Sequence, residues 1–360
     1  MRKLYRALNG SLLCLCLCLI LGLMLVTQRS MEVLQTPSSS PIKELSRLQH
    51  VYQWKREEMK FLIQQPSAYV APHDPILVDL ILADHIRQPN QGPKSQKLLD
   101  VIKDPKIEYG GQYEQSLIVD KHFQGKRNGF FIEAGAWNGA YLSNSLFLEV
   151  ERNWTGLLVE ANTKAFEHLL ALQRRAFSFH GCLSISNQSA KVTFDGADVF
   201  GTIKKNKSDL TRGEAALEQN RAGLDKNHRS TYVVQCFPLY SLLLALGNPE
   251  VDYFSLDVEG SEMDVLRTIP WDKVRIKTLT IEVEHSDAQM ITTFMETNGY
   301  SMVQKIGKVD LFFVRNSYAY VAPHDPILVD LILADHIRQP NQGPKSQKLL
   351  DVIKDPKIEY

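Results

Sequence analysis

Strand and helix signals alternate along residues 110–317, and this alternation constrains the fold more than any other feature of the sequence. Short apolar runs are typical of buried strands, and the segments between them have the apolar spacing of helices. The pattern predicts an α/β domain in which helices cover both faces of a mostly parallel sheet. Strands are expected at 129–134, 155–160, 177–183, 232–237, 252–258 and 276–284. Helices are expected at 140–150, 164–172, 238–246, 262–269 and 288–298, and an antiparallel hairpin at 300–304 and 310–315.

The chain divides into five parts by pattern. Residues 1–28 read as a cytosolic tip and signal-anchor transmembrane helix, residues 29–67 as a stem or linker, and residues 68–109 as a helical segment before the domain. The domain itself spans 110–317 and contains a charged insertion. Residues 318–360 contain an unchanged copy of 68–109, which we interpret as an artefact or a loose tail because structural repeats diverge and stack in three or more copies. The charged stem helix is expected at 42–62 and the insertion at 203–230.

An apolar run at 12–26, inside a charge-free stretch at 7–28, is near the shortest length that spans a bilayer. Arg2, Lys3 and Arg6 precede it, which predicts a cytosolic N-terminus and a lumenal remainder. A cleaved signal peptide is the alternative, although the residues after the run form a poor cleavage site. We therefore expect a single-pass type II membrane protein of the secretory pathway, in the endoplasmic reticulum, the Golgi, an endosome or the plasma membrane, with membrane lipid as a partner of residues 7–28.

Composition and cysteine placement limit the partners and the compartment. The 41 basic and 41 acidic residues balance, so nucleic acid is not an expected partner. Of the five cysteines, Cys182 and Cys236 lie in the predicted domain. In an oxidising lumen they could form one disulfide, and two buried free thiols remain the alternative.

Acidic residues and glycines gather where predicted strands end, which is where ligands bind in parallel α/β sheets. Glu133 closes the first strand, and Gly135 and Gly139 allow a tight turn beside a ligand. Glu160 ends the next strand, 27 residues further on, where a carboxylate accepts hydrogen bonds from both ribose hydroxyls of a nucleoside. The ordered pair of acids predicts a nucleoside-binding crevice.

A second acidic group follows the strand at 252–258. In an extended chain Asp257 and Glu259 lie on the same side, whereas Glu262 reads as a residue of the first helical turn. Crowded carboxylates raise one another's pKa, which suits a proton acceptor, and they can also share a cation, although the pattern alone assigns no metal ligand. His285 is a candidate base by its pKa range, although a single histidine is more often structural.

These residues carry a family resemblance. The strings Glu133-x-Gly-Ala-x-x-Gly139 and Leu256-Asp-Val-Glu-Gly-x-Glu262, together with Glu160, resemble the FkbM-type S-adenosylmethionine (SAM) methyltransferase domain. The resemblance implies a Rossmann-like methyltransferase fold with a seven-stranded sheet, SAM as cofactor, and a sugar or polyketide hydroxyl as acceptor. It places Glu133, Gly135, Ala136 and Gly139 beside SAM, Glu160 at its ribose, and Asp257 and Glu259 near the acceptor. Trp137 stands where many methyltransferases have a second glycine.

The strings Asn128-Gly-Phe-Phe-Ile-Glu-Ala-Gly-Ala and Val251-Asp-Tyr-Phe-Ser-Leu-Asp-Val-Glu-Gly are also similar to arthropod Star-like proteins. That resemblance implies a signal-anchored protein that escorts transmembrane growth-factor precursors out of the endoplasmic reticulum. Two hypotheses follow: a lumenal SAM-dependent O-methyltransferase acting on a glycan or another hydroxyl acceptor, with Asp257, Glu259 or His285 taking the proton, and a cargo receptor that keeps the fold without catalysis.

Overall fold

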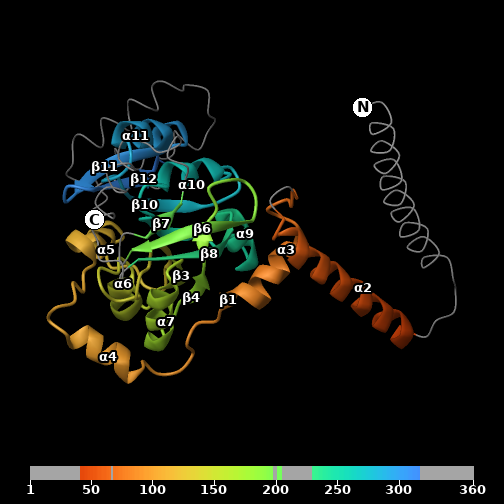
Figure 1. Ribbon diagram of the computed structural model, residues 1–360. Helices are drawn as coiled ribbons and strands as arrows, with labels where there is room; N and C mark the ends of the chain where they lie inside the picture. Colours follow the sequence, from red (N-terminus) through yellow and green to blue (C-terminus); the bar gives the residue numbers. More distant parts are fainter. Residues whose placement is uncertain (1–40, 66–67, 198–200, 205–228, 317–360) are drawn as a thin grey trace, which may run out of the picture. The chain divides into compact units, whose positions relative to one another are not determined.

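A computed structural model describes residues 41–65, 68–197, 201–204 and 229–316 (Figure 1). The predicted membrane-spanning run, most of the charged insertion and the second copy of the repeat lie outside these residues. In the part of the chain that the structure describes, no helix combines the length and the apolar character needed to cross a bilayer. The chain forms two compact units, the first ending at Phe61 and the second beginning at Leu62. The predicted stem helix is confirmed as α2 (Pro41–Leu62).

The second unit is built on an eight-stranded sheet in the order β1-β4-β3-β2-β9-β10-β12-β11. Neighbouring strands from β4 to β10 pair in parallel, and β12 pairs antiparallel with both β10 and β11. The predicted α/β sheet and its closing hairpin are therefore confirmed. The seven strands that the family resemblance implied are exceeded by one, because the short edge strand β1 pairs antiparallel with β4. The strand expected at 232–237 was wrongly placed, since it belongs to a second sheet. The strands are β1 (Ile86–Arg87), β2 (Phe130–Ala134), β3 (Thr155–Glu160), β4 (Phe177–His180), β9 (Val251–Leu256), β10 (Ile276–Glu282), β11 (Tyr300–Ile306) and β12 (Asp310–Arg315).

The central strands are buried because alternate side chains pack against helices. Phe131, Leu158 and Tyr253 belong to one apolar cluster with Val119 of α5 and Leu148 of α6. All six residues of β9 are buried, as expected of a strand in the middle of a covered parallel sheet. The helical segments are α3 (Pro75–Leu80), η1 (Ile81–His85), α4 (Gln96–Lys103), η2 (Gln112–Glu114), α5 (Gln115–His122), α6 (Leu146–Arg152), α7 (Thr163–Leu172), α9 (Leu239–Ala245), α10 (Glu262–Thr268) and α11 (Ala288–Thr297).

The helix start predicted from Asp74 and Pro75 is confirmed. The Asp74 carboxylate accepts hydrogen bonds from the backbone N–H groups of Ile76 at 2.8 Å and Leu77 at 3.2 Å. Pro75 occupies the first helical position, where its missing N–H costs nothing. Capping side chains and the fixed φ of proline therefore define the start of α3.

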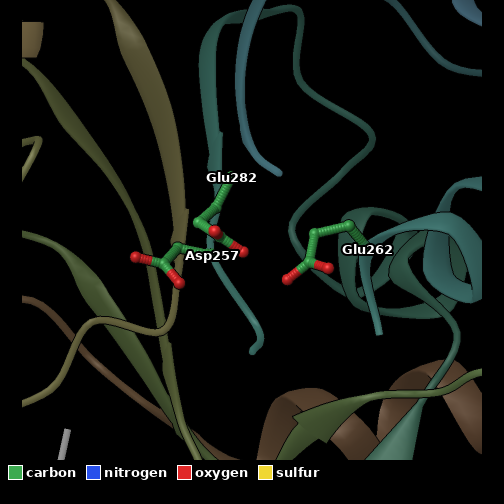
Figure 2. Close-up of side chains that lie close together, drawn as sticks. All are labelled: Asp257, Glu262 and Glu282. Carbon is green, nitrogen blue, oxygen red and sulfur yellow. The ribbon is translucent and has the colours of Figure 1, made fainter. Parts of the chain in front are cut away.

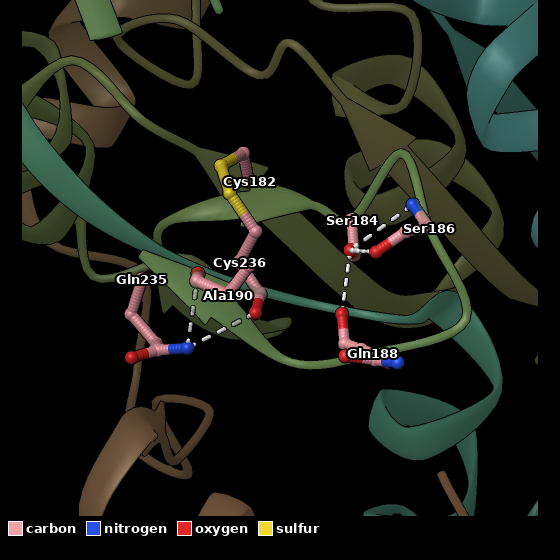
Figure 3. The surroundings of a disulfide bond; sticks show 7 residues. All are labelled: Cys182, Ser184, Ser186, Gln188, Ala190, Gln235 and Cys236. Carbon is pink, nitrogen blue, oxygen red and sulfur yellow. Dashed lines mark hydrogen bonds between the residues drawn. A yellow bond between two sulfur atoms is a disulfide. The ribbon is translucent and has the colours of Figure 1, made fainter. Parts of the chain in front are cut away.

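A second sheet, in the order β5-β8-β6-β7, was only partly predicted. Its strands are β5 (Cys182–Leu183), β6 (Ala190–Ala197), β7 (Thr202–Ile203) and β8 (Arg229–Phe237). Cys182 and Cys236 are direct partners in the β5–β8 pair, with Cα atoms 4.5 Å apart, and form a disulfide (Figure 3). The disulfide alternative of the sequence analysis is the one that the structure contains.

Three predicted boundaries were wrong for local reasons. The helix expected at 140–150 begins at Leu146, because the Asn138 side chain accepts hydrogen bonds from the N–H groups of residues 140 and 141 and holds them in a turn. The strand expected at 177–183 divides at Gly181 between the two sheets. The strand expected at 252–258 ends at Leu256, so Asp257 and Glu259 lie in the following turn rather than on one side of a strand.

Candidate functional site

A cavity of about 360 Å³ lies where β2, β3, β9 and β10 end. That volume falls within the range of small-molecule sites. The chain leaves β2 toward β3 and β4 and later returns to β9 on the other side of β2, so the cavity lies at the point where the strand order reverses. The lining includes Glu133, Gly135, Glu160, Asp257 and Glu259. Cys182, Phe194 and Ile203 of the second sheet also line it.

Gly135 joins the two sides of this cavity. Its φ is +87°, and a Cβ atom at this position would lie 1.9 Å from the backbone oxygen of Asp257. The N–H groups of Gly135 and Ala136 both donate to the backbone oxygen of Val159, each at 3.1 Å. Only glycine permits this approach, which brings the turn after β2 against both β3 and the turn after β9.

Glu133 lines the cavity, but its carboxylate is held mainly by the chain itself. It accepts hydrogen bonds from the Ser143 hydroxyl at 3.0 Å, from the Asn144 N–H at 2.8 Å and from the Ser145 hydroxyl. Burial raises the pKa of Glu133, while Arg174 and these donors lower it. Its hydrogen bonds therefore hold the segment after Gly139 in place, and its carboxyl group also lines the cavity.

Arg174 completes that support and was missed by sequence reasoning. Its guanidinium forms a buried ion pair with Glu149, at 2.8 Å, and donates to the backbone oxygen of Gly139 at 2.5 Å and to Ser145 Oγ at 3.0 Å. These partners lie 25 to 35 residues away in the sequence. No local pattern marks a basic residue after a helix as the partner of a glycine turn, so only the fold identifies it.

Glu160 lies at the end of β3, where its carboxylate closes the glycine turn. Oε2 accepts the N–H of Trp137 at 2.6 Å and Oε1 accepts the N–H of Asn162 at 2.5 Å. Burial raises the pKa of Glu160 to about 7, against the lowering effect of its backbone hydrogen bonds. Carboxylate oxygens have about four acceptor positions, so the group can also accept from a ligand hydroxyl. This placement suits the predicted ribose contact.

Asp257 and Glu259 both line the cavity although they are not on a strand. Glu259 has a φ of +54°, and its backbone oxygen accepts the Thr202 hydroxyl at 2.9 Å, which ties the turn to the second sheet. His285 does not line the cavity; its Nε2 lies 3.4 Å from Glu259 Oε2. Burial lowers the pKa of His285, against the raising effect of Glu284.

A cluster of acidic groups lies on the β9–β10 side of the cavity. One oxygen each of Asp257, Glu262 and Glu282 lie within 4.8 Å of one another (Figure 2). Burial, and then the neighbouring carboxylates, raise the pKa of Asp257, and the same two causes raise the pKa of Glu282 to about 10. The sequence analysis interpreted Glu262 as a residue of the first helical turn and did not place Glu282 beside Asp257 and Glu262. Their proximity follows from the parallel pairing of β9 with β10, which no local motif shows.

Comparison with known proteins gives the class of this domain. Residues 133–302 match the sequence profile of the Methyltransferase FkbM domain. Together with the strand order and the cavity, the match identifies this region as a methyltransferase FkbM domain, as the sequence resemblance had indicated.

Solved structures of low similarity also match. A methyltransferase from Pyrococcus furiosus is 14% identical over 59% of this chain and 86% of its own, with a TM-score of 0.29. A fibrillarin pre-rRNA processing protein from Methanococcus jannaschii is 12% identical over 53% of this chain and 68% of its own, with a TM-score of 0.29. A precorrin-6y C5,15-methyltransferase from Geobacter metallireducens is 11% identical over 63% of this chain and 98% of its own, with a TM-score of 0.28. Among curated proteins, none matches.

Proposed function

We propose that this protein is a SAM-dependent O-methyltransferase that is anchored in a membrane of the secretory pathway by residues 7–28 and acts on the lumenal side. The observation that carries the proposal is the shared cavity of Glu133 and Glu160. These acids come from neighbouring parallel strands and face one space at the switch point of a methyltransferase FkbM domain. The Star-like resemblance of the sequence supports the membrane placement.

The residues present fit a nucleoside cofactor. Glu160 would accept hydrogen bonds from the ribose hydroxyls, and the turn at Gly135, Ala136 and Gly139 would lie against the rest of SAM, since Gly135 leaves the backbone uncovered by a side chain. When bound, SAM supplies an electrophilic methyl group, so the chain's own task is to orient the acceptor and to receive a proton.

The acceptor side of the cavity is acidic. Asp257 and Glu259 face the cavity from the turn after β9, and either carboxylate can take the proton from an acceptor hydroxyl. His285 would act through Glu259, because their side chains lie in contact and the imidazole is outside the lining. A hydroxyl of a glycan is the acceptor class that we propose.

A cargo receptor for transmembrane growth-factor precursors is the second candidate. It is favoured by the internal use of the site's acids, because Glu133 and Glu160 both accept hydrogen bonds from the chain itself. A domain that no longer binds SAM could keep these acids for stability alone. The two candidates differ in whether Glu160 contributes to ligand binding.

Calorimetry of the full chain in detergent, titrated with SAM, separates the candidates. We expect saturable binding that Glu160→Gln weakens at least about tenfold, since loss of hydrogen bonds to a charged group costs about 1.5–3 kcal/mol. Glu167→Gln, a change on the exposed face of α7, is the control and should leave affinity unchanged. Absence of binding would reject the methyltransferase proposal. Co-precipitation of a growth-factor precursor that is lost on deletion of residues 29–67 would then support the receptor.

A further inference from the structure

We propose that Asp257, Glu262 and Glu282 form a binding site for a divalent cation of the size of Ca²⁺ in the wall of the cavity. The three side chains come from different elements: the turn after β9, the first turn of α10 and the end of β10. Figure 2 shows the Glu282 carboxyl group between those of Asp257 and Glu262. Carboxylate oxygens are the ligands that hard divalent cations prefer.

The number of carboxylates favours Ca²⁺ over Mg²⁺. One oxygen of each of the three side chains lies within 4.8 Å of the others, so all three can contact one ion. Ca²⁺ takes about 6–8 oxygen ligands, many of them carboxylate oxygens, whereas Mg²⁺ usually keeps several waters and is bound through one or two carboxylates. Three carboxylates in one cluster therefore suit Ca²⁺ better.

Unpaired buried oxygens give an independent reason to expect a ligand. Glu282 is 5% exposed, and its Oε2 has no hydrogen-bond partner among the described residues, while its other oxygen accepts the N–H of Glu284. The Ser261 hydroxyl, 1% exposed and also in the cavity lining, likewise has no partner within the described ranges. Leaving a buried polar group unpaired costs about 1–3 kcal/mol, more when it is charged. A cation at the cluster would satisfy Glu282.

Charge balance points the same way. Across the part of the chain that the structure describes, no lysine or arginine forms an ion pair with any of the three carboxylates. Asp310, 2% exposed, pairs with Glu282 in the β10–β12 ladder and adds a further acid to the half-buried Asp257 and the buried Glu262 and Glu282. Buried charges without compensation are strongly unfavourable, so protons or a cation must neutralise the group.

Hydrogen-bond donors are distributed unevenly over the cluster. The Glu262 carboxylate accepts the N–H groups of Val258 at 2.9 Å and Gly260 at 3.1 Å, and the Ser286 hydroxyl at 2.6 Å. Glu282 Oε2 has no such donor among the described residues. A divalent cation beside it would supply the missing partner and neutralise two charges at once.

The site would face the same space as the proposed cofactor contacts, because Asp257 and Glu282 both line the cavity. Its remaining coordination positions would be open to water or, if the proposed methyltransferase function holds, to neighbouring hydroxyl oxygens of the acceptor. Cation binding itself does not depend on that function, so it is tested without SAM.

The test uses the full chain in detergent, stripped with a chelator, dialysed and titrated with CaCl₂ by calorimetry, with thermal unfolding in parallel. We expect saturable binding of one ion with a dissociation constant below about 1 mM, a higher melting temperature with Ca²⁺, and weaker binding of MgCl₂. Glu282→Gln should lose the binding and the shift. Asp264→Asn changes a half-buried acid on the same helix as Glu262, which pairs with Arg267 outside the cluster, and should keep both.

The fold of the variant is checked in chelator, where Glu282→Gln should melt no lower than the parent, because the amide has the shape of the carboxyl group and cannot ionise beside the other carboxylates. The proposed site would be contradicted if the parent shows neither heat of Ca²⁺ binding nor a higher melting temperature with Ca²⁺. It would also be contradicted if Glu282→Gln shows both effects at the size seen in the parent. Absence of SAM binding in the separate titration would reject the enzyme and leave this result unaffected.

Discussion

The two sides of the cavity use acidic residues in different ways. On the β2–β3 side, Glu133 and Glu160 each accept hydrogen bonds from nearby N–H or hydroxyl donors. On the β9–β10 side, Asp257 and Glu282 lie against other carboxylates, and Glu282 has an oxygen without a partner among the described residues. Strand ends of one parallel sheet therefore give one side suited to neutral hydroxyl groups and another suited to a positive ion.

The largest expected effect comes from the residue that joins both sides. In Gly135→Ala, the new Cβ would meet the Asp257 backbone oxygen at 1.9 Å, at a φ of +87°. We expect a loss of about 5 kcal/mol in the free energy of unfolding, measured by urea denaturation, since backbone atoms cannot move aside cheaply.

Gly247→Ala is the matched control for this change. Gly247 has a φ of +82°, but nothing lies within 4 Å of the added Cβ. The free energy of unfolding of Gly247→Ala should fall only by the cost of placing alanine in the left-handed conformation, which is about 1–2 kcal/mol. Equal losses in the two variants would show that the two sides do not meet at Gly135 as the structure has it.

The next effect distinguishes the β2–β3 side through pH. Burial raises the pKa of Glu160 from 4.5 to about 7. Between these values the native state binds more protons than the unfolded state, so stability from this group is fully present below pH 4.5 and is lost as pH rises through 7. The contribution is at most about 3 kcal/mol.

Glu160→Gln should remove that component, which is read as the difference between the two proteins' unfolding free energies at pH 5 and pH 8. The parent should lose more stability than the variant over this interval. If the unfolding free energy of the variant falls as much as that of the parent between pH 5 and pH 8, burial does not raise the pKa of Glu160 in the folded protein.

The smallest effects are expected to have opposite signs on the two sides. Glu133→Gln weakens a carboxylate that three donors hold, and should lower the unfolding free energy by about 2 kcal/mol. The pKa of Glu282 is raised to about 10 by burial and by neighbouring carboxylates. Glu282→Gln removes the cost of keeping that proton in the folded state, and should raise the unfolding free energy by about 1 kcal/mol at pH 7 in the presence of chelator. Urea denaturation of both variants and of the parent, all in the presence of chelator, measures the two changes in unfolding free energy. Changes of the same sign would contradict the proposed difference between the two sides of the cavity.

Elements that depend mainly on residues close together in the sequence were predicted correctly. The apolar run at 155–160 is β3, and Asp74 caps α3 as expected. The ordered pair of Glu133 and Glu160 was placed correctly at one cavity, because the ends of neighbouring parallel strands meet at one edge of a sheet.

Long-range pairing could not be predicted in the same way. Arg174 supports the glycine turn from a loop 35 residues away. Glu282 meets Asp257 because β10 pairs with β9, and no spacing in the chain encodes that distance. The strand expected at 252–258 was also too long, since period-two alternation continued through Asp257 and Glu259, whereas the backbone turns there with a φ of +54° at Glu259.

A crystal structure of the protein with S-adenosylhomocysteine tests the central claim most directly. The account predicts that the ribose hydroxyls lie within hydrogen-bonding distance of Glu160, with the glycine turn at Gly135 against the nucleoside and Glu133 still bonded to Ser143 and Asn144. A nucleoside bound elsewhere, or a cavity between Glu133 and Glu160 filled by protein side chains when the ligand is present in excess, would contradict it.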